Sequence, residues 1–156
     1  MKDLYFAYGS NLCWRQMKER CKDSKFVCRA RLSDFRLAFT RYSSTRRSGV
    51  ADIRRDPGEH VWGVIYEVSE EDLDALNRFE GYRGPGKDNA YGQLRVRVAK
   101  EGVGEEWVLT YQVAKPAKDH IQPSRYYLQL IIEGAKRWHL PLEYRQRLER
   151  FMSDQL

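Results

Sequence analysis

One carboxylate of the chain occupies a position suited to acid–base chemistry. Glu80 falls at the C-terminal end of a predicted helix, directly before Gly81 and between Phe79 and Tyr82. A negative charge there opposes the helix dipole, and burial between aromatic side chains would penalise the charged form further. Both effects raise the pKa of a carboxyl group toward the range in which a general base works at neutral pH. The same spacing also fits a solvated surface glutamate, so the pattern makes Glu80 a candidate general base.

A second candidate site is the segment Tyr5-Phe6-Ala7-Tyr8-Gly9-Ser10-Asn11, which joins a predicted strand to a predicted helix. Backbone N–H groups at the start of a helix lack partners within it and attract an anion or a developing oxyanion. Gly9 has no side chain, so a ligand could approach the backbone closely. Helix capping by Ser10 or Asn11 explains the same residues without any ligand. Both interpretations remain open at this point.

Other kinds of site have weak support. Gly81–Asp88 reads G-x-x-x-x-G-K-D, but a phosphate-binding loop needs Ser or Thr in place of Asp88 and a helix, not a strand, after it. The histidines are scattered and the serines lie in caps or loops, which disfavours a metal site and a nucleophilic triad. Cys13, Cys21 and Cys28 lack C-x-x-C spacing. Their odd number excludes a complete set of internal disulfides.

Strands and helices must together position these residues. The predicted strands are Asp3–Tyr8, Phe26–Leu32, Asp34–Arg41, Val50–Ile53, Val61–Val68, Gln93–Ala99 and Glu105–Val113. The predicted helices cover about Leu12–Arg20, a segment from Ser69 to Phe79 that opens with a capping-box pattern, a segment opened by Pro123-Ser124, and Leu142–Phe151. Helices and strands do not alternate regularly, which disfavours a doubly wound parallel sheet. The order predicts an α+β fold with a small mixed β-barrel-like sheet and surrounding helices.

Length and composition predict a single domain, residues 1–156, with a substantial core. The chain has 156 residues, and 42% of them are apolar. No apolar run approaches the length of a membrane span and no secretory signal is evident, so we expect a cytoplasmic protein. Lys and Arg number 28 against 22 Asp and Glu, a net charge of +6 that permits an anionic partner. The basic residues are scattered rather than gathered in one stripe, which argues against nucleic-acid binding.

Several segments, taken in order, resemble the γ-glutamylcyclotransferase family. They are YFAYGSNL, VADI followed by PGEHVWGVIYEV, LNRFEG after its helix, and the late PSRYYLQLIIEGAKRWHLPLEY. The resemblance extends from about Tyr5 to Leu148, nearly the whole chain. YGSN alone is moderately specific, whereas YGSN, EG, PSxxY and GA-x-x-x-x-LP in this order are highly specific.

This resemblance implies a mixed domain around a small barrel and a cyclisation without cofactor or metal. In the family, the α-amino group of a γ-glutamyl amino acid or amine attacks its own γ-carbonyl and yields 5-oxoproline and the free amino acid or amine. By position, the catalytic glutamate falls on Glu80 and the late binding tyrosine on Tyr127, with Tyr126 as the neighbour that could be confused with it. The substrate-binding loop falls on Tyr5, Phe6, Ala7, Tyr8, Gly9 and Ser10. The implied partner is a small-molecule γ-glutamyl substrate, with no nucleic acid or membrane, and family members often form homodimers.

Two alternative functions remain beside this one. The first is a non-catalytic basic, aromatic-rich module that binds an anionic ligand or nucleic acid, which the net charge and ten tyrosines permit. The second is a γ-glutamyl lyase of a biosynthetic pathway, with the same chemistry and an unusual amine. The Gly81–Gly92 loop is longer than in some family members and directly follows Glu80. We expect this loop to line the pocket of the leaving group, whose identity the sequence leaves open.

Overall fold

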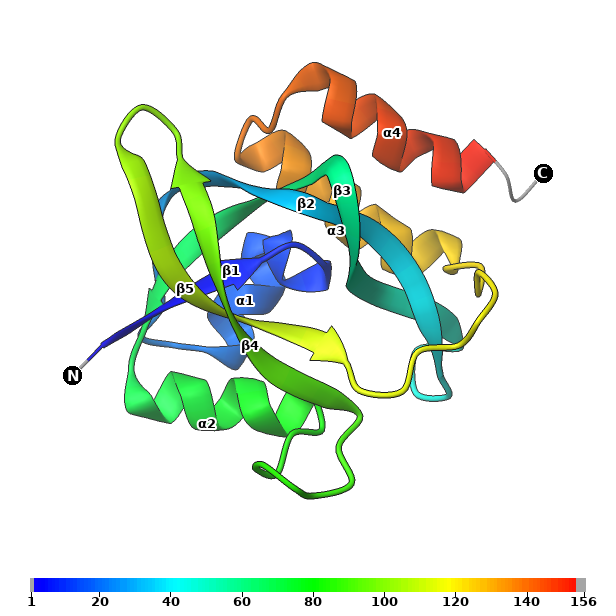
Figure 1. The fold of residues 1–156 in the computed structure, drawn as a ribbon, viewed down its shortest axis with the longest axis horizontal. Coiled ribbons are helices and arrows are strands. Elements are labelled where there is room, and N and C mark those ends of the chain that lie inside the picture. The colour runs from blue at the N-terminus through cyan, green and yellow to red at the C-terminus, as the bar shows by residue number, and fades with distance from the viewer. Residues whose placement is uncertain (1, 154–156) are drawn as a thin grey trace.

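The described residues, 2–153 of the computed structural model, form a closed barrel of five strands with helices packed around it (Figure 1). The strands are β1 (Asp3–Ala7), β2 (Lys25–Ser43), β3 (Ser48–Val68), β4 (Tyr91–Lys100) and β5 (Gly104–Val113). Around the barrel their order is β1-β3-β2-β4-β5. Tyr5 pairs in parallel with Leu109 to close the barrel, and the other neighbouring strands are antiparallel. This architecture confirms the predicted α+β fold with a barrel-like sheet.

Helices cover the barrel on two sides. They are the 3₁₀ helix η1 (Ser10–Leu12) and the α-helices α1 (Trp14–Arg20), α2 (Glu70–Phe79), α3 (Arg125–Arg137) and α4 (Leu142–Ser153). In Figure 1, α2 lies at one end of the barrel, and α3 and α4 pack together on the opposite side. The four predicted α-helices are confirmed, although the first is divided between η1 and α1. None of the helices in residues 2–153 has the length and apolar character that crossing a bilayer requires.

Two predicted strand breaks are bulges inside longer strands. The predicted strands Phe26–Leu32 and Asp34–Arg41 form the single β2, and Val50–Ile53 and Val61–Val68 form the single β3. At their shared bulge the pairing shifts register, Asp34 has a φ of 66°, and its carboxylate accepts a hydrogen bond from the Gly58 N–H group. The turn-forming residues therefore bend two paired strands without ending them. The predicted count of about seven strands was wrong for this reason.

One hydrophobic core fills the barrel and continues under α3. Its largest fully buried side chains include Phe6, Phe39 and Tyr66. Gly134 of α3 permits close packing, because a Cβ at this position would lie only 2.2 Å from the carbonyl carbon of Leu12. The helix therefore lies directly against η1 and supports the turn that precedes Leu12.

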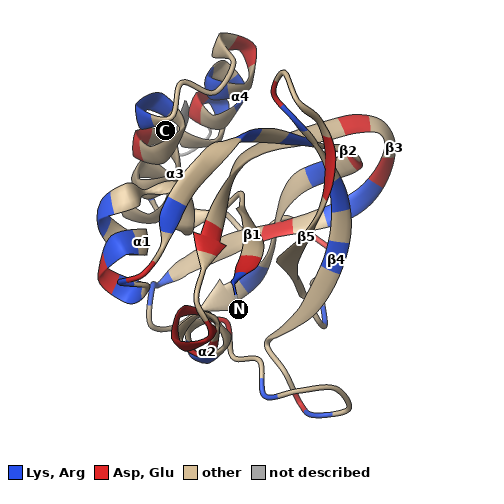
Figure 2. Ribbon diagram, turned by 90° about the vertical axis from the view of Figure 1, so that its left-hand side faces the viewer, with Lys and Arg blue, Asp and Glu red and all other residues tan. Residues whose placement is uncertain are grey.

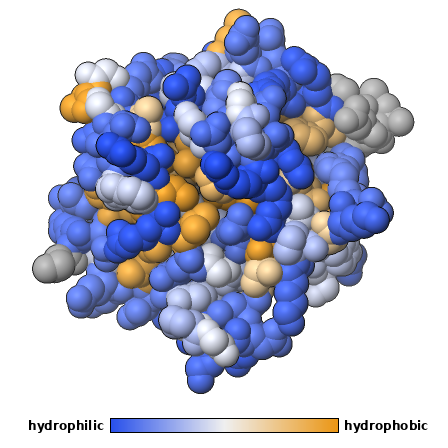
Figure 3. Space-filling model, in the orientation of Figure 1, coloured by the Kyte–Doolittle hydropathy of each residue, from blue (hydrophilic) through white to orange (hydrophobic). Residues whose placement is uncertain are grey.

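Charged side chains of both signs are spread over the molecule. Basic and acidic segments intermingle from β3 and β4 to α1 and α4 (Figure 2). Hydrophilic residues cover most of the face seen in Figure 3, where apolar surface shows only in smaller areas between them. This distribution agrees with the scattered basic residues of the sequence and gives no support to a nucleic-acid-binding stripe.

Candidate active site

Most of the predicted site residues meet in one cavity of about 300 Å³. The predicted residues that line it are Tyr5, Tyr8, Gly9, Ser10, Glu80 and Tyr127. Phe6 and Ala7 do not line it: both side chains are fully buried, and Phe6 belongs to the core. A cavity of this size lies at the lower end of the range for small-molecule sites. The contact of substrate with Phe6 and Ala7 stays a prediction.

The two ends of α2 fix where Glu80 lies. At the start, the Ser69 hydroxyl accepts a hydrogen bond from the Asp72 N–H group and the Asp72 carboxylate accepts one from the Ser69 N–H group, which confirms the predicted capping box. At the other end, the Gly81 N–H group donates to the Arg78 carbonyl at 3.2 Å. Gly81 has a φ of 64°, the left-handed conformation that ends many helices. Glu80 is thus the last residue before the chain leaves the helix.

Hydrogen bonds to the barrel hold this end of α2 in place. The Asn77 side-chain oxygen accepts hydrogen bonds from the Tyr111 hydroxyl at 2.6 Å and from the Gln93 side-chain amide at 2.8 Å. The Glu80 carbonyl accepts a further bond from the Tyr91 N–H group at 3.2 Å. Glu80 is therefore tied both to its own helix and to β4 and β5.

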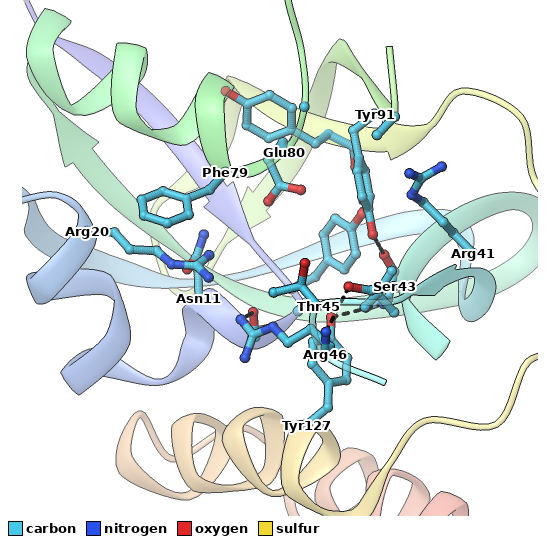
Figure 4. A pocket seen from close by; sticks show the side chains of 18 of the residues that line it. Asn11, Arg20, Arg41, Ser43, Thr45, Arg46, Phe79, Glu80, Tyr91 and Tyr127 are labelled. Atoms are coloured by element: carbon cyan, nitrogen blue, oxygen red, sulfur yellow. Dashed lines mark hydrogen bonds between the residues drawn. The ribbon is translucent and has the colours of Figure 1, made fainter. Parts of the chain in front are cut away.

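The Glu80 carboxyl group is partly buried and directed into the cavity (Figure 4). Burial raises its pKa to about 7, and the positive charges of Arg20 and Arg46 oppose this rise without cancelling it. Among residues 2–153, no side chain or backbone group donates a hydrogen bond to this carboxylate. The pKa shift has the direction that a buried helix-end position predicts. A carboxyl with this pKa can both accept and release a proton near pH 7.

Tyrosines form the walls around Glu80. Tyr5, Tyr8, Tyr91, Tyr111 and Tyr127 line the cavity, and burial raises the pKa of each above its usual value. All five hydroxyl groups are therefore neutral at physiological pH. They can donate or accept hydrogen bonds without adding charge to the site.

Tyr91 and Tyr127 both form hydrogen bonds with the backbone of Ala51 in β3. The Ala51 N–H group donates to the Tyr127 hydroxyl oxygen at 3.0 Å, and the Tyr91 hydroxyl donates to the Ala51 carbonyl at 2.7 Å. A Cβ on Gly9 would lie 3.6 Å from the Tyr127 hydroxyl oxygen and 3.2 Å from the Ala51 Cβ. Tyr127 therefore lies against the Gly9 turn, whereas Tyr126 is 65% exposed. Burial in the cavity favours Tyr127 over Tyr126 as the binding tyrosine.

Four arginines that the sequence did not indicate also line the cavity, namely Arg20, Arg41, Arg46 and Arg78. Two of them are held by hydrogen bonds to polar side chains of η1 and α1. The Arg20 guanidinium donates to the Asn11 side-chain oxygen at 3.4 Å, and the Arg46 guanidinium donates to the Gln16 side-chain oxygen at 2.9 Å. Gln16 and Arg20 are four residues apart on α1, so their shared helix face was a usable signal. Arg46 had no local signal, because the pairing of β2 with β3 brings its turn to the cavity.

The Gly81–Gly92 loop lines the cavity with residues near its two ends, Gly81, Ala90 and Tyr91. That this loop lines the pocket of the leaving group stays a prediction. The last residues of β2 and the turn that follows them also line the cavity, from Arg41 to Arg46.

Comparison with known proteins places these features in a family. The model of the AIG2-like family matches residues 60–148. The γ-glutamylcyclotransferase of Homo sapiens is 36% identical over 154 residues, which cover 94% of this chain and 77% of the human protein. That of Bos taurus is also 36% identical, over 149 residues, which cover 93% of this chain and 76% of the bovine protein.

A solved structure supports the same relationship. A γ-glutamyl cyclotransferase superposes with a TM-score of 0.87 at 35% sequence identity, covering 96% of this chain and 87% of that chain. The similarity therefore includes the barrel, the helices and the turn that carries YGSN. The chain belongs to the AIG2-like family and, within it, to the γ-glutamylcyclotransferases.

Proposed function

We propose that this protein converts γ-glutamyl amino acids or amines into 5-oxoproline and the free amino acid or amine, with Glu80 as general base and acid. The observation that carries the proposal is the Glu80 carboxyl, directed into a tyrosine-walled cavity with a pKa of about 7. The raised pKa makes the Glu80 carboxylate a stronger base than an ordinary glutamate. Proton transfer to it from the substrate α-ammonium group is correspondingly less unfavourable.

The reaction balances within one molecule of substrate. Glu80 accepts a proton from the α-ammonium group, and the freed nitrogen attacks the γ-carbonyl carbon. The new bond between nitrogen and carbon closes a five-membered lactam ring. The bond from that carbon to the leaving nitrogen breaks as Glu80 returns its proton to this nitrogen. The ring nitrogen gives up its second proton, which the released amine takes up to leave as an ammonium ion. No water is consumed and nothing is oxidised or reduced.

Positioning supplies much of the expected rate enhancement. Attack within one molecule needs the amine and the carbonyl to be held in contact, which a shaped cavity does by restricting rotation of the substrate. The neutral tyrosine hydroxyls offer hydrogen-bond donors for the oxyanion that develops during the attack. We place the γ-glutamyl half against Gly9, Ser10 and Tyr127, because all three line the cavity and a Cβ on Gly9 would lie only 3.6 Å from the Tyr127 hydroxyl oxygen.

Incubation with a panel of γ-glutamyl amino acids and amines tests this function. We expect 5-oxoproline and the released amine to form in equal amounts for at least one substrate. The same substrate with its α-amino group acetylated is the control and should yield neither product. Release of free glutamate in place of 5-oxoproline would identify a hydrolase and contradict the proposal. No turnover on any panel member would favour a binding module.

A further inference from the structure

We propose that Arg20 and Arg46 form a subsite for the α-carboxylate of the γ-glutamyl group, an inference that rests on the proposed cyclisation. The two residues come from separate elements, since Arg20 ends α1 and Arg46 lies in the turn between β2 and β3. Both line the same cavity as Glu80. Figure 4 shows the two guanidinium groups on one side of this cavity, below the Glu80 carboxylate.

One polar network orients both guanidinium groups. The Gln16 side-chain amide donates to the Ser10 hydroxyl oxygen at 2.8 Å and to the Asn11 side-chain oxygen at 2.9 Å. Arg46 donates to Gln16 and also to the Ser10 hydroxyl oxygen at 3.4 Å, while Arg20 donates to Asn11. The arginines are thus held through neutral groups, and their positive charges are not neutralised by these contacts. Such pre-oriented guanidinium groups suit the planar recognition of a carboxylate.

The two positive charges of Arg20 and Arg46 favour the binding of an anion between them. Arg20 and Arg46 are both partly buried, and neither forms an ion pair with a carboxylate among residues 2–153. Burial and the positive charge of Arg46 lower the pKa of Arg20, so both disfavour the charged form of Arg20. Glu80 compensates only in part, because a carboxyl group with a pKa of about 7 is incompletely ionised at neutral pH. A bound carboxylate would relieve this repulsion.

Geometry assigns this subsite to the α-carboxylate rather than to the leaving group. The Arg46 guanidinium lies 5.3 Å from the centre of the Tyr127 ring and beside Ser10, where we place the γ-glutamyl half. The α-carboxylate and the α-amino group share one carbon atom. Holding the carboxylate beside Arg20 and Arg46 therefore brings the amine to Glu80. Arg41 lies beyond Tyr91 from Glu80 in Figure 4, outside this cluster.

Binding of two lactams that differ only in the carboxylate tests the subsite without turnover. 5-Oxoproline carries the α-carboxylate, and 2-pyrrolidinone is the same ring without it. Each is titrated by ligand-observed NMR into the parent, Arg46→Gln, Arg20→Gln and Arg47→Gln. Arg47 adjoins Arg46 but does not line the cavity, so its variant is the matched control. Thermal unfolding establishes that each variant is folded.

We expect the parent and Arg47→Gln to prefer 5-oxoproline over 2-pyrrolidinone. Loss of a hydrogen bond to a charged partner should weaken 5-oxoproline binding to Arg46→Gln and to Arg20→Gln by about tenfold to a hundredfold. Binding of 2-pyrrolidinone should not change. An absence of preference in the parent, or a preference that survives in both variants, overturns the subsite. Because these titrations need no catalysis, failure of the cyclisation itself would appear separately, as absent 5-oxoproline in the substrate panel.

Discussion

The Glu80 side chain experiences opposing influences on its pKa. Burial favours the neutral acid, whereas Arg20 and Arg46 favour the carboxylate, and burial is the larger effect. The surrounding tyrosines are neutral hydrogen-bonding groups that do not offset this balance with charge. A carboxyl group in this environment changes protonation near neutral pH, as a group that both accepts and returns a proton should.

The pH dependence of turnover should report this ionisation. If Glu80 must be ionised to accept a proton, kcat/KM should fall about tenfold per pH unit below a midpoint near 7. Removal of a positive charge in Arg46→Gln should move that midpoint upward, because Arg46 lowers the pKa of Glu80. Measurement of kcat/KM from pH 5 to pH 9 checks both expectations. A rate independent of pH between 5 and 7 would exclude Glu80 as the titrating base.

The same pKa has a consequence for stability. Glu80 has a pKa of about 7 in the folded protein against a usual value of 4.5. Between these values the folded state binds more protons than the unfolded state, so the free energy of unfolding falls as pH rises. Glu80→Gln cannot ionise and avoids this loss. Relative to the parent, the variant should therefore gain about 1–2 kcal/mol between pH 4.5 and pH 8, allowing for partial solvent exposure.

Urea unfolding of parent and variant at both pH values measures this gain. The free energies of unfolding of the two proteins should differ less at pH 4.5 than at pH 8, because the Glu80 carboxyl group is protonated in the folded state at pH 4.5. An equal difference at pH 4.5 and pH 8 would show that the folded-state pKa of Glu80 is not raised.

For single helices and strands, the sequence predicted those features that depend on residues close together in the chain, such as the two ends of a helix. The capping box that begins α2 and the glycine that ends it follow from the sequence, and they place Glu80 at the helix end. The length of β2 and β3 did not follow, because Asp34 and Gly58 fit a turn as well as a bulge. Long-range pairing between two strands decides between these outcomes. The same pairing brings Arg46 to the cavity, so this site residue could not be predicted locally.

Glycine at the end of α2 offers a test of how the element positions the base. Gly81 has a φ of 64°, and a Cβ there would lie 2.9 Å from the Ala90 Cβ. Gly86 has a φ of 75° with no atom within 4 Å of such a Cβ. Both substitutions to Ala should cost about 1–2 kcal/mol of stability through backbone strain. Only Gly81→Ala should also displace Glu80 and lower kcat.

Unfolding free energies and kcat of the two alanine variants are to be compared with those of the parent. Gly86→Ala is the matched control, since it carries the same backbone strain at a distance from the cavity. Equal kcat values for both variants would mean that the end of α2 does not set the position of Glu80.

At the scale of the whole molecule, the site is assembled from distant parts of the chain. The Gly9 turn joins β1 to η1, and Glu80 directly follows α2. α3 supplies Tyr127, whose hydroxyl lies near the Gly9 turn and accepts a hydrogen bond from Ala51 of β3. Their spacing in the sequence does not predict that these residues lie close together. The barrel and the packing of Gly134 against Leu12 bring them together in the folded protein. The family resemblance predicted that Glu80 and Tyr127 belong to one site, whereas the residue pattern alone did not assign a role to Tyr127 and left Glu80 as a candidate.

The rate of 5-oxoproline formation by Glu80→Gln tests most directly whether Glu80 is the catalytic base. The amide has nearly the volume of the carboxyl group but cannot accept the proton. With the best substrate of the panel, we expect kcat to fall by about 10²–10⁴-fold. The variant should remain folded, with a melting temperature at pH 8 no lower than that of the parent. Formation of 5-oxoproline at the parent rate by the folded variant would contradict the assignment of Glu80 as the base.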